Sequence, residues 1–219
     1  MSILNQSLAE LAINVGGATR VFHQYGLDFC CAGQQTLAEA LQRRGVDEKA
    51  VLTALDNLAQ CRQPEPDWSQ QPVADLVQHI LDRFHDKHRR QMPELIRLAQ
   101  RVETVHQASP DCPSGLAEHL TLMLDELESH MLKEEQILFP MLINGMYPQG
   151  PINVMLEDHL EHGQALEKMV MLAHHFILPE GACNSWRALY AGVQELKEDL
   201  MEHIHLENHI LFVPRHVKA

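Results

Sequence analysis

The sequence has few basic residues relative to acidic ones, and this shortage limits the partners that it can bind. Lys and Arg together number 17 against 30 Asp and Glu, which gives a formal net charge of −13. Binding to the phosphate backbone of nucleic acid, or to an anionic lipid surface, needs clustered positive charge. We therefore expect neither a nucleic acid nor a membrane as a partner.

Long uninterrupted apolar segments are also lacking. One long stretch without a charged residue, 137–156, contains three prolines and two glycines, so it is expected to be a turn between helices rather than a membrane span. The N-terminus has no positively charged segment before its apolar stretch, which includes Glu10, so it does not resemble a signal peptide. These features predict a soluble protein.

Cysteines are few, and their arrangement does not suggest disulfides. There are five, and Cys30 and Cys31 are adjacent, where a disulfide would be strained. An odd count with an adjacent pair does not fit the disulfide framework of a secreted protein, so we expect a cytoplasmic location. Histidine is abundant by contrast, with 15 residues against 6 Phe and 3 Tyr. A chain that is both acidic and rich in histidine is expected to bind metal.

The hydrophobic pattern indicates an all-α protein, because strand-like alternation of apolar and polar residues is scarce. Glycines separate short helical segments in residues 1–62, a polar stretch with prolines suggests a linker at 63–72, and longer helical patterns fill 73–219. The expected helices are 8–15, 18–25, 36–44 and 49–60, then 73–105 (with a kink or break at Pro93), 115–139, 151–176 and 184–214. Short connections favour antiparallel neighbours, so we predict a small N-terminal helical domain followed by an antiparallel four-helix bundle.

Two stretches of the predicted bundle, 126–140 and 199–214, resemble each other. In one register they share a carboxylate, Leu, His and Glu, followed by Ile-Leu-Phe and a nearby Pro. In each stretch the His and the Glu are four residues apart, so both project from one face of a helix. The two pairs are His130 with Glu134 and His203 with Glu207. The matching flanks indicate an internal repeat.

Each half of the bundle also carries an earlier histidine. His85 precedes His130 by 45 residues, and His159 precedes His203 by 44. Folding the two halves about a pseudo-twofold axis would bring four His and two Glu together between the helices, which is how helical bundles build dinuclear metal sites.

The spacing leaves some roles open. His88 and His162 are placed as symmetrically as the earlier histidines just named, at 42 and 41 residues before the two paired histidines, so spacing does not decide between the two sets. Glu126 and Asp199 lie one turn before the paired histidines, and they are candidates for hydrogen bonds that orient the ligands.

The types of the candidate ligands narrow the choice of metal. A carboxylate can bridge two cations and offset their charge, and imidazole suits iron, zinc, copper and nickel. Structural zinc would favour a closed tetrahedral site with thiolates, and no cysteine lies near these histidines in the sequence. Four His and two bridging Glu leave open coordination positions. We predict two iron ions, with manganese as the second choice.

Several motifs in order along the chain resemble a known family. They are Phe22 to Gly33 with the double cysteine, His-Asp-Lys-His at 85–88, the segment 130–140, Glu-Asp-His at 157–159 and His-Ile-His-Leu-Glu-Asn at 203–208. The second half resembles hemerythrin-like di-iron domains, and the whole chain resembles the repair of iron centres family of stress-response proteins. The family pattern has Glu just before the third-helix ligand, whereas this chain has Asp158.

The resemblance implies which residues bind the metals and what the protein does. It implies His85 rather than His88, and His159 rather than His162. The implied ligand set is His85, His130, Glu134, His159, His203 and Glu207. It also implies repair of iron–sulfur clusters damaged by nitric oxide or peroxide, with damaged iron–sulfur proteins as partners.

Three functions fit these residues. The iron pair could be donated to damaged clusters, with Cys30 and Cys31 receiving or transferring it; it could reduce nitric oxide or remove oxidant as an enzyme; or it could bind oxygen as a carrier or sensor. A simple carrier needs no thiols, and Gly26 and Gly33 suggest an exposed, reactive turn around the cysteines. We therefore favour donation over turnover.

The sequence leaves a homodimer open. Because His106 lies 21 residues after His85, about 31 Å along a continuous helix, we do not expect it to bind the same metals.

Overall fold

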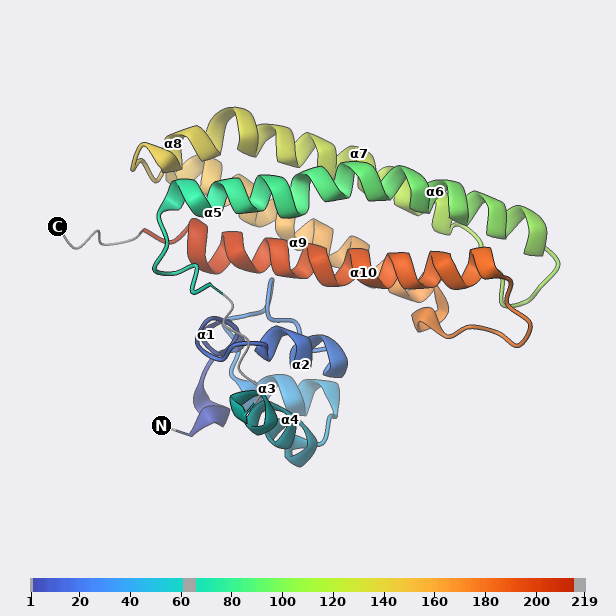
Figure 1. Cartoon of the computed structure of the whole chain (residues 1–219), viewed down its shortest axis with the longest axis horizontal. Coiled ribbons are helices and arrows are strands. Elements are labelled where there is room, and N and C mark those ends of the chain that lie inside the picture. The colour runs from blue at the N-terminus through green and yellow to red at the C-terminus, as the bar shows by residue number, and fades with distance from the viewer. Residues whose placement is uncertain (1, 61–65, 215–219) are drawn as a thin grey trace. The chain divides into compact units, whose positions relative to one another are not determined.

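The computed structural model describes residues 2–60 and 66–214 (Figure 1). Its contacts divide the chain into two units, one formed by Met1–Leu76 with Met201–Ala219 and the other by Val77–Leu200. The division passes through α10 (Asn184–Leu206), which is one continuous helix. Regular structure in the described residues is helical, apart from an isolated bridge between Ser7 and Thr36, and this confirms the all-α prediction. Part of the expected linker, 63–65, lies outside the described residues.

The N-terminal helices are short and begin with clear capping signals. They are η1 (Ile3–Asn5), α1 (Leu8–Asn14), α2 (Ala18–Tyr25), α3 (Leu37–Arg44) and α4 (Glu48–Gln60). The Ser7 and Thr36 side chains accept hydrogen bonds from the backbone N–H groups three residues later, at Glu10 and Glu39. The side chains of these two glutamates accept hydrogen bonds from the backbone N–H groups of Ser7 and Thr36 in turn. Gly26 ends α2 with φ 65°, a left-handed conformation that glycine adopts at no steric cost. The four predicted segments are therefore present as helices.

Long helices form the predicted bundle. The segments are α5 (Val73–Ile80), η2 (Leu81–His85), α6 (Asp86–His106), α7 (Leu116–Lys133), η3 (Glu134–Leu138), α8 (Phe139–Ile143), α9 (Gln149–Leu172), η4 (His174–Phe176), α10 and η5 (Glu207–Leu211). α6, α7, α9 and α10 run lengthwise beside one another in Figure 1, and α7 packs on both α6 and α9. The short connections 107–115, 144–148 and 173–183 reverse the chain at each end. The antiparallel arrangement predicted from the sequence is confirmed.

The break or kink considered at Pro93 does not interrupt the first of these helices. α6 continues through Pro93 as far as His106. Proline removes one backbone hydrogen bond, but the helix around it is held by buried apolar side chains, among them Met92, Leu95 and Ala99. Burying a side chain such as Leu or Met contributes about 1.5–3 kcal/mol, so Met92 and Leu95 together offset a loss of about 3 kcal/mol.

Three helical segments have π geometry, with backbone hydrogen bonds from residue i+5 to residue i. The Phe139 N–H donates to Glu134 O, and the Phe212 N–H donates to Glu207 O at 2.8 Å; the third such turn is η2, which ends at His85. A π turn inserts one extra residue into a helix and occurs frequently at functional sites. The internal repeat seen in the sequence is therefore repeated in the backbone, at equivalent positions.

Candidate metal centre

The six candidate ligands come from every long helix of the bundle. His85 ends η2, His130 lies on α7 just before Glu134 at the start of η3, and His159 lies on α9. His203 and Glu207 repeat the α7–η3 arrangement on α10 and η5. All six are buried, with at most 1% of their surface exposed. Two fully buried carboxylates are costly unless they are paired or coordinate a metal.

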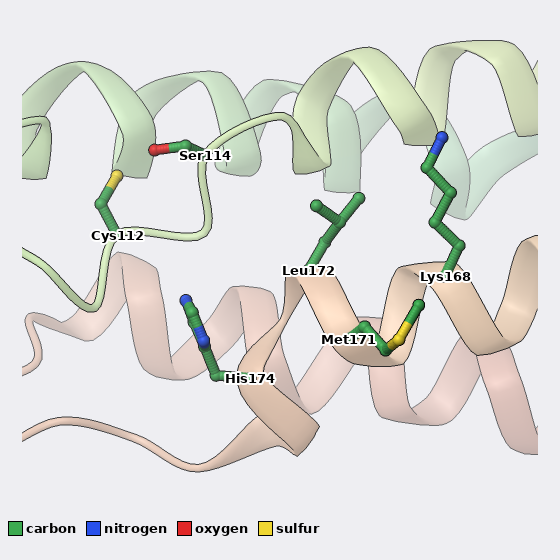
Figure 2. A pocket seen from close by; sticks show the side chains of 6 residues that line it. All are labelled: Cys112, Ser114, Lys168, Met171, Leu172 and His174. Carbon is green, nitrogen blue, oxygen red and sulfur yellow. The ribbon is translucent and has the colours of Figure 1, made fainter.

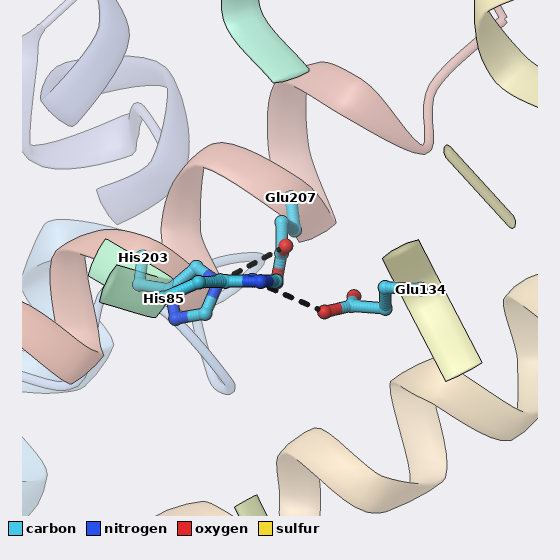
Figure 3. A group of neighbouring side chains, drawn as sticks. All are labelled: His85, Glu134, His203 and Glu207. Atoms are coloured by element: carbon cyan, nitrogen blue, oxygen red, sulfur yellow. Dashed lines mark hydrogen bonds and ion pairs between the residues drawn. The ribbon is translucent and has the colours of Figure 1, made fainter. Parts of the chain in front are cut away.

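Within Val77–Leu200, one carboxylate faces two imidazoles from different helices. Glu134 Oε2 lies 3.5 Å from His85 Nε2 and 3.4 Å from His130 Nε2. His130 Nε2 lies 3.1 Å from His159 Nε2. On the last helix, His203 Nε2 lies 3.1 Å from Glu207 Oε1 (Figure 3). In each of these contacts the Nε2 atom of the histidine is the one turned toward the cluster.

Ligand atoms of these residues form two groups, in each of which all atoms lie within 4.8 Å of one another. One group is His85, Glu134, His203 and Glu207 (Figure 3), and the other is His130, Glu134, His159 and Glu207. The two carboxylates belong to both groups, whereas each histidine belongs to one. Each group takes one histidine from each half of the internal repeat.

The spacing of these atoms matches the donors around two cations. Nitrogen or oxygen donors about 2.1 Å from an octahedral cation are about 3.0 Å apart when adjacent and about 4.2 Å apart when opposite. The observed 3.1–3.5 Å separations, inside a 4.8 Å limit, fall close to these values. Shared carboxylates would offset the charge of both ions. The donor set therefore fits a dinuclear cation site.

Two further carboxylates contact the outer nitrogens of the histidines. His85 Nδ1 donates to Glu135 Oε1 at 2.8 Å, and His130 Nδ1 donates to Asp158 Oδ2 at 3.2 Å. Burial alone would raise the pKa of Glu135, but hydrogen bonds from Arg89 and His85 outweigh it and lower that pKa. The pKa of Asp158 is lowered in the same way, against burial, by Lys133 and His130. An ionised carboxylate on Nδ1 fixes the tautomer that leaves Nε2 available to a metal.

Comparison with known proteins agrees with this geometry. Residues 76–213 match the family described as Hemerythrin HHE cation binding domain, and residues 4–59 match one described as Domain of Unknown function (DUF542). Iron-sulfur cluster repair protein YtfE of Dickeya chrysanthemi (strain Ech1591) is 48% identical over 221 residues, covering 100% of both chains. The proteins of the same name from Yersinia pseudotuberculosis serotype IB (strain PB1/+) and Yersinia pestis (strain Pestoides F) are 50% and 49% identical over the same full length. The chain belongs to this family of iron-sulfur cluster repair proteins.

In this family member, the two carboxylates predicted to orient the ligands have different surroundings. Asp199 is buried and pairs with Arg83, 2.6 Å from Nη2 to Oδ1, and with Lys87. Glu126 is exposed and lines a hollow of about 330 Å³. Glu135 and Asp158 contact the Nδ1 atoms of His85 and His130, and the sequence reasoning missed both as hydrogen-bond partners. The sequence feature that could have indicated them is adjacency, because Glu135 follows the candidate ligand Glu134 and Asp158 precedes the candidate ligand His159.

The alternative histidines lie next to the centre or far from it. His88 is buried beside the Phe84 ring, and His162 packs edge-on against His130, with 4.8 Å between ring centroids. Neither belongs to the two ligand groups. His106 ends α6, where its Nε2 lies 3.2 Å from Cys183 Sγ and its ring packs on Trp186.

The hollow that Glu126 lines is acidic, and one of its lining residues, Asp158, contacts the candidate ligand His130. Its lining is Asp125, Glu126, Ser129, Lys133, Asp158, Glu161 and His162. A second hollow of about 420 Å³ is lined by Cys112, Ser114, Lys168, Met171, Leu172 and His174 (Figure 2). No candidate ligand lines this second hollow.

None of the helices in the described residues is long and apolar enough to cross a bilayer.

The two adjacent cysteines are thiols in a loop that follows α2. Their sulfur atoms are 3.7 Å apart, and Cys30 Sγ donates to Asp28 Oδ1 at 3.3 Å. The hydrogen bond with Cys31, followed by burial, raises the pKa of the Cys30 thiol well above its usual value. The Cys31 side chain is half-buried, so the loop presents one covered and one more accessible thiol.

Proposed function

We propose that this chain is a di-iron protein that repairs iron–sulfur clusters damaged by nitric oxide or oxidants, and that it does so by donating iron. The observation that carries this proposal is a pair of buried His and Glu groups that share both carboxylates and contain no thiolate. The relatives that match the chain over its full length are named iron-sulfur cluster repair proteins. Damaged iron–sulfur proteins are then its partners.

The ligand roles follow from the two groups. His85 and His203 would hold one iron, His130 and His159 the other, and Glu134 and Glu207 would bridge them. Imidazole and carboxylate suit iron, and manganese is the second choice for the same donors. Metal analysis combined with Mössbauer and electron-spin-resonance spectra of the purified protein tests this assignment. Two irons per chain with an antiferromagnetically coupled spectrum are expected, and two manganese or zinc ions would overturn it.

A site of this kind is suited to giving up its metal. Protons compete for histidine and carboxylate ligands, so local protonation weakens the hold on the cation without breaking a metal–thiolate bond. Glu135 and Asp158 hold the outer protons of two ligands and thus control their basicity. The thiols of Cys30 and Cys31 offer stronger, softer donors to which a released iron could pass.

The alternative is an enzyme that reduces nitric oxide or removes oxidant at the same pair. It is favoured by the small number of protein donors, because two histidines and two shared carboxylates per ion leave coordination positions for a small molecule.

A double Cys30→Ser, Cys31→Ser variant with full iron occupancy separates the two functions. Donation predicts that this variant no longer reactivates an iron–sulfur dehydratase damaged by nitric oxide, while the reduced metals still consume nitric oxide. Transfer is followed with ⁵⁷Fe loaded into the bundle and counted in the acceptor. Wild-type protein that turns over nitric oxide many times with an electron donor, yet never surrenders iron, would establish the enzyme instead.

A further inference from the structure

The loop that carries the two cysteines is organised around one carboxylate. Asp28 Oδ1 accepts hydrogen bonds from the backbone N–H groups of Cys30, at 3.2 Å, and of Cys31, at 3.0 Å. The same oxygen accepts the Cys30 thiol proton at 3.3 Å. A carboxylate and two thiols are thereby held together, with one ligand atom from each inside a 4.8 Å limit.

Two of the three distances among these atoms are close to the edges of a tetrahedral cation site, and the third lies within the same 4.8 Å limit. With metal–sulfur bonds of about 2.3 Å and a metal–oxygen bond of about 2.1 Å, the ideal sulfur–sulfur edge is about 3.8 Å and the sulfur–oxygen edge about 3.6 Å. The observed separations are 3.7 Å between the sulfurs and 3.3 Å from Cys30 Sγ to Asp28 Oδ1. A cation could therefore enter with shifts of a few tenths of an ångström.

The loop is also fixed in place by the end of the last helix, which belongs to the same unit. The Cys30 carbonyl accepts hydrogen bonds from Asn208 Nδ2, at 3.2 Å, and His209 Nε2, at 2.9 Å. A Cβ atom on Gly33 would lie 2.6 Å from His209 Nε2 and 2.4 Å from Phe29 O, so only glycine allows this approach. Asn208 and His209 directly follow Glu207 in η5, which links the cysteine loop to a turn that carries a candidate bridging ligand.

We propose that Asp28, Cys30 and Cys31 form a second cation site, which binds one divalent cation of the iron(II) or zinc(II) class through two thiolates and one carboxylate. The fourth position stays open, as in sites that exchange their ligands. Binding forms two metal–sulfur bonds and releases the two thiol protons to solvent, with no change in oxidation state. A role of this second site in passing iron to an acceptor rests on the proposed donation function, whereas the binding of a divalent cation at the site does not.

The test uses the full chain with its bundle already loaded with iron, titrated under anaerobic conditions with Co²⁺ as the probe. Cobalt bound to thiolate gives an intense sulfur-to-metal charge-transfer band in the near ultraviolet, whereas cobalt on imidazole and carboxylate gives only weak visible bands. We expect the intense band to reach a plateau at one cobalt per chain. Absence of the band would overturn the proposal.

Variants assign the band to the three residues. Cys30→Ser with Cys31→Ser should abolish it, and Cys31→Ser alone, at the less buried position, should weaken it without disturbing the fold. Asp28→Asn keeps an oxygen for the backbone N–H groups but loses the charge, so affinity should fall at least tenfold. Unchanged affinity in Asp28→Asn would reduce Asp28 to a loop-stabilising residue and refute the three-ligand site.

Matched controls and a second measurement distinguish failure of the second cation site from failure of iron donation. Cys112→Ser and Cys183→Ser should keep the full cobalt band, and its loss in either would place the probe elsewhere. Iron content of the bundle is measured in the same samples. A missing cobalt band with intact iron refutes only the second site, whereas failure of iron transfer with the cobalt band intact refutes only donation.

Discussion

Glu135 Oε1 lies 2.8 Å from His85 Nδ1, although 50 residues separate the two in the sequence. The preceding residue, Glu134, faces Nε2 of the same imidazole at 3.5 Å. Two consecutive glutamates at the start of η3 thus hold both nitrogens of one ring. One carboxylate is placed to share a cation with the histidine, and the other keeps the ring proton on the opposite nitrogen.

Replacing Glu135 with Gln should weaken one metal and spare the other. The amide oxygen can still accept the Nδ1 proton, but the negative charge that raises the basicity of His85 is lost, so affinity at that ion should fall about 10–100-fold. The lowered pKa of Glu135 keeps it ionised at neutral pH, and its support is lost only as the pH falls through that value. Chelator competition measures both affinities. Glu128→Gln, which removes the other partner of Arg89, is the control, and an equal loss there would point to Arg89 instead.

Glu134→Leu or Glu207→Leu should release both metals, because each carboxylate belongs to both ligand groups and its removal leaves two cations facing each other. By contrast, His159→Ala should weaken only the ion that it shares with His130, and His203→Ala only the other. Metal content after gel filtration distinguishes these patterns. Retention of two metals per chain in either glutamate variant would rule out a shared carboxylate.

His106→Ala should keep both metals, because His106 contacts Cys183 and Trp186 at the far end of α6. The variant loses the ring packing on Trp186, so a small decrease in the free energy of unfolding, about 1 kcal/mol, is expected. His85→Ala is the positive control and should lose metal. If His106→Ala also lost one iron, the continuous helix between the two histidines would be wrong.

Asp199→Asn should destabilise the fold without releasing metal. Asp199 is buried and holds Arg83 and Lys87, so loss of its charge should lower the free energy of unfolding by about 1–3 kcal/mol, reduced by the partial exposure of Arg83. Urea denaturation measures this change. Glu195→Gln removes a more exposed partner of Lys87 and should cost less than about 0.5 kcal/mol. Loss of metal from Asp199→Asn would restore the role in orienting the ligands that its sequence position suggested.

The sequence was sufficient to predict the helices and the equivalence of the two His-Glu pairs. Spacing of four residues puts both side chains on one helical face whatever the helix packs against, and the matching flanks marked the repeat. The way the histidines divide between the two groups was not predicted. It depends on which helices are neighbours, and a twofold repeat is compatible with more than one pairing.

The partners of the histidine Nδ1 atoms could not be predicted for a related reason. The sequence favours Glu126 and Asp199 because they lie one turn from a ligand on its own helix, whereas a ring that points between helices can meet its outer partner on a neighbouring helix. Glu135 and Asp158 approach from such helices, 50 and 28 residues away from the histidines that they contact. The contact between Cys30 and the end of the last helix spans 179 residues at His209 and had no local signal.

The π turns that begin at Glu134 and Glu207 fix the number of residues that these two segments can contain. Each residue of a helix rotates the chain by about 100°, so the extra residue in 134–138 sets the direction of everything that follows it. Deleting one residue there would restore regular α-helical hydrogen bonds while turning Phe139, now 2% exposed, out of the core. Insertions and deletions should therefore be excluded from this segment and from 207–211, even where individual side chains can be exchanged.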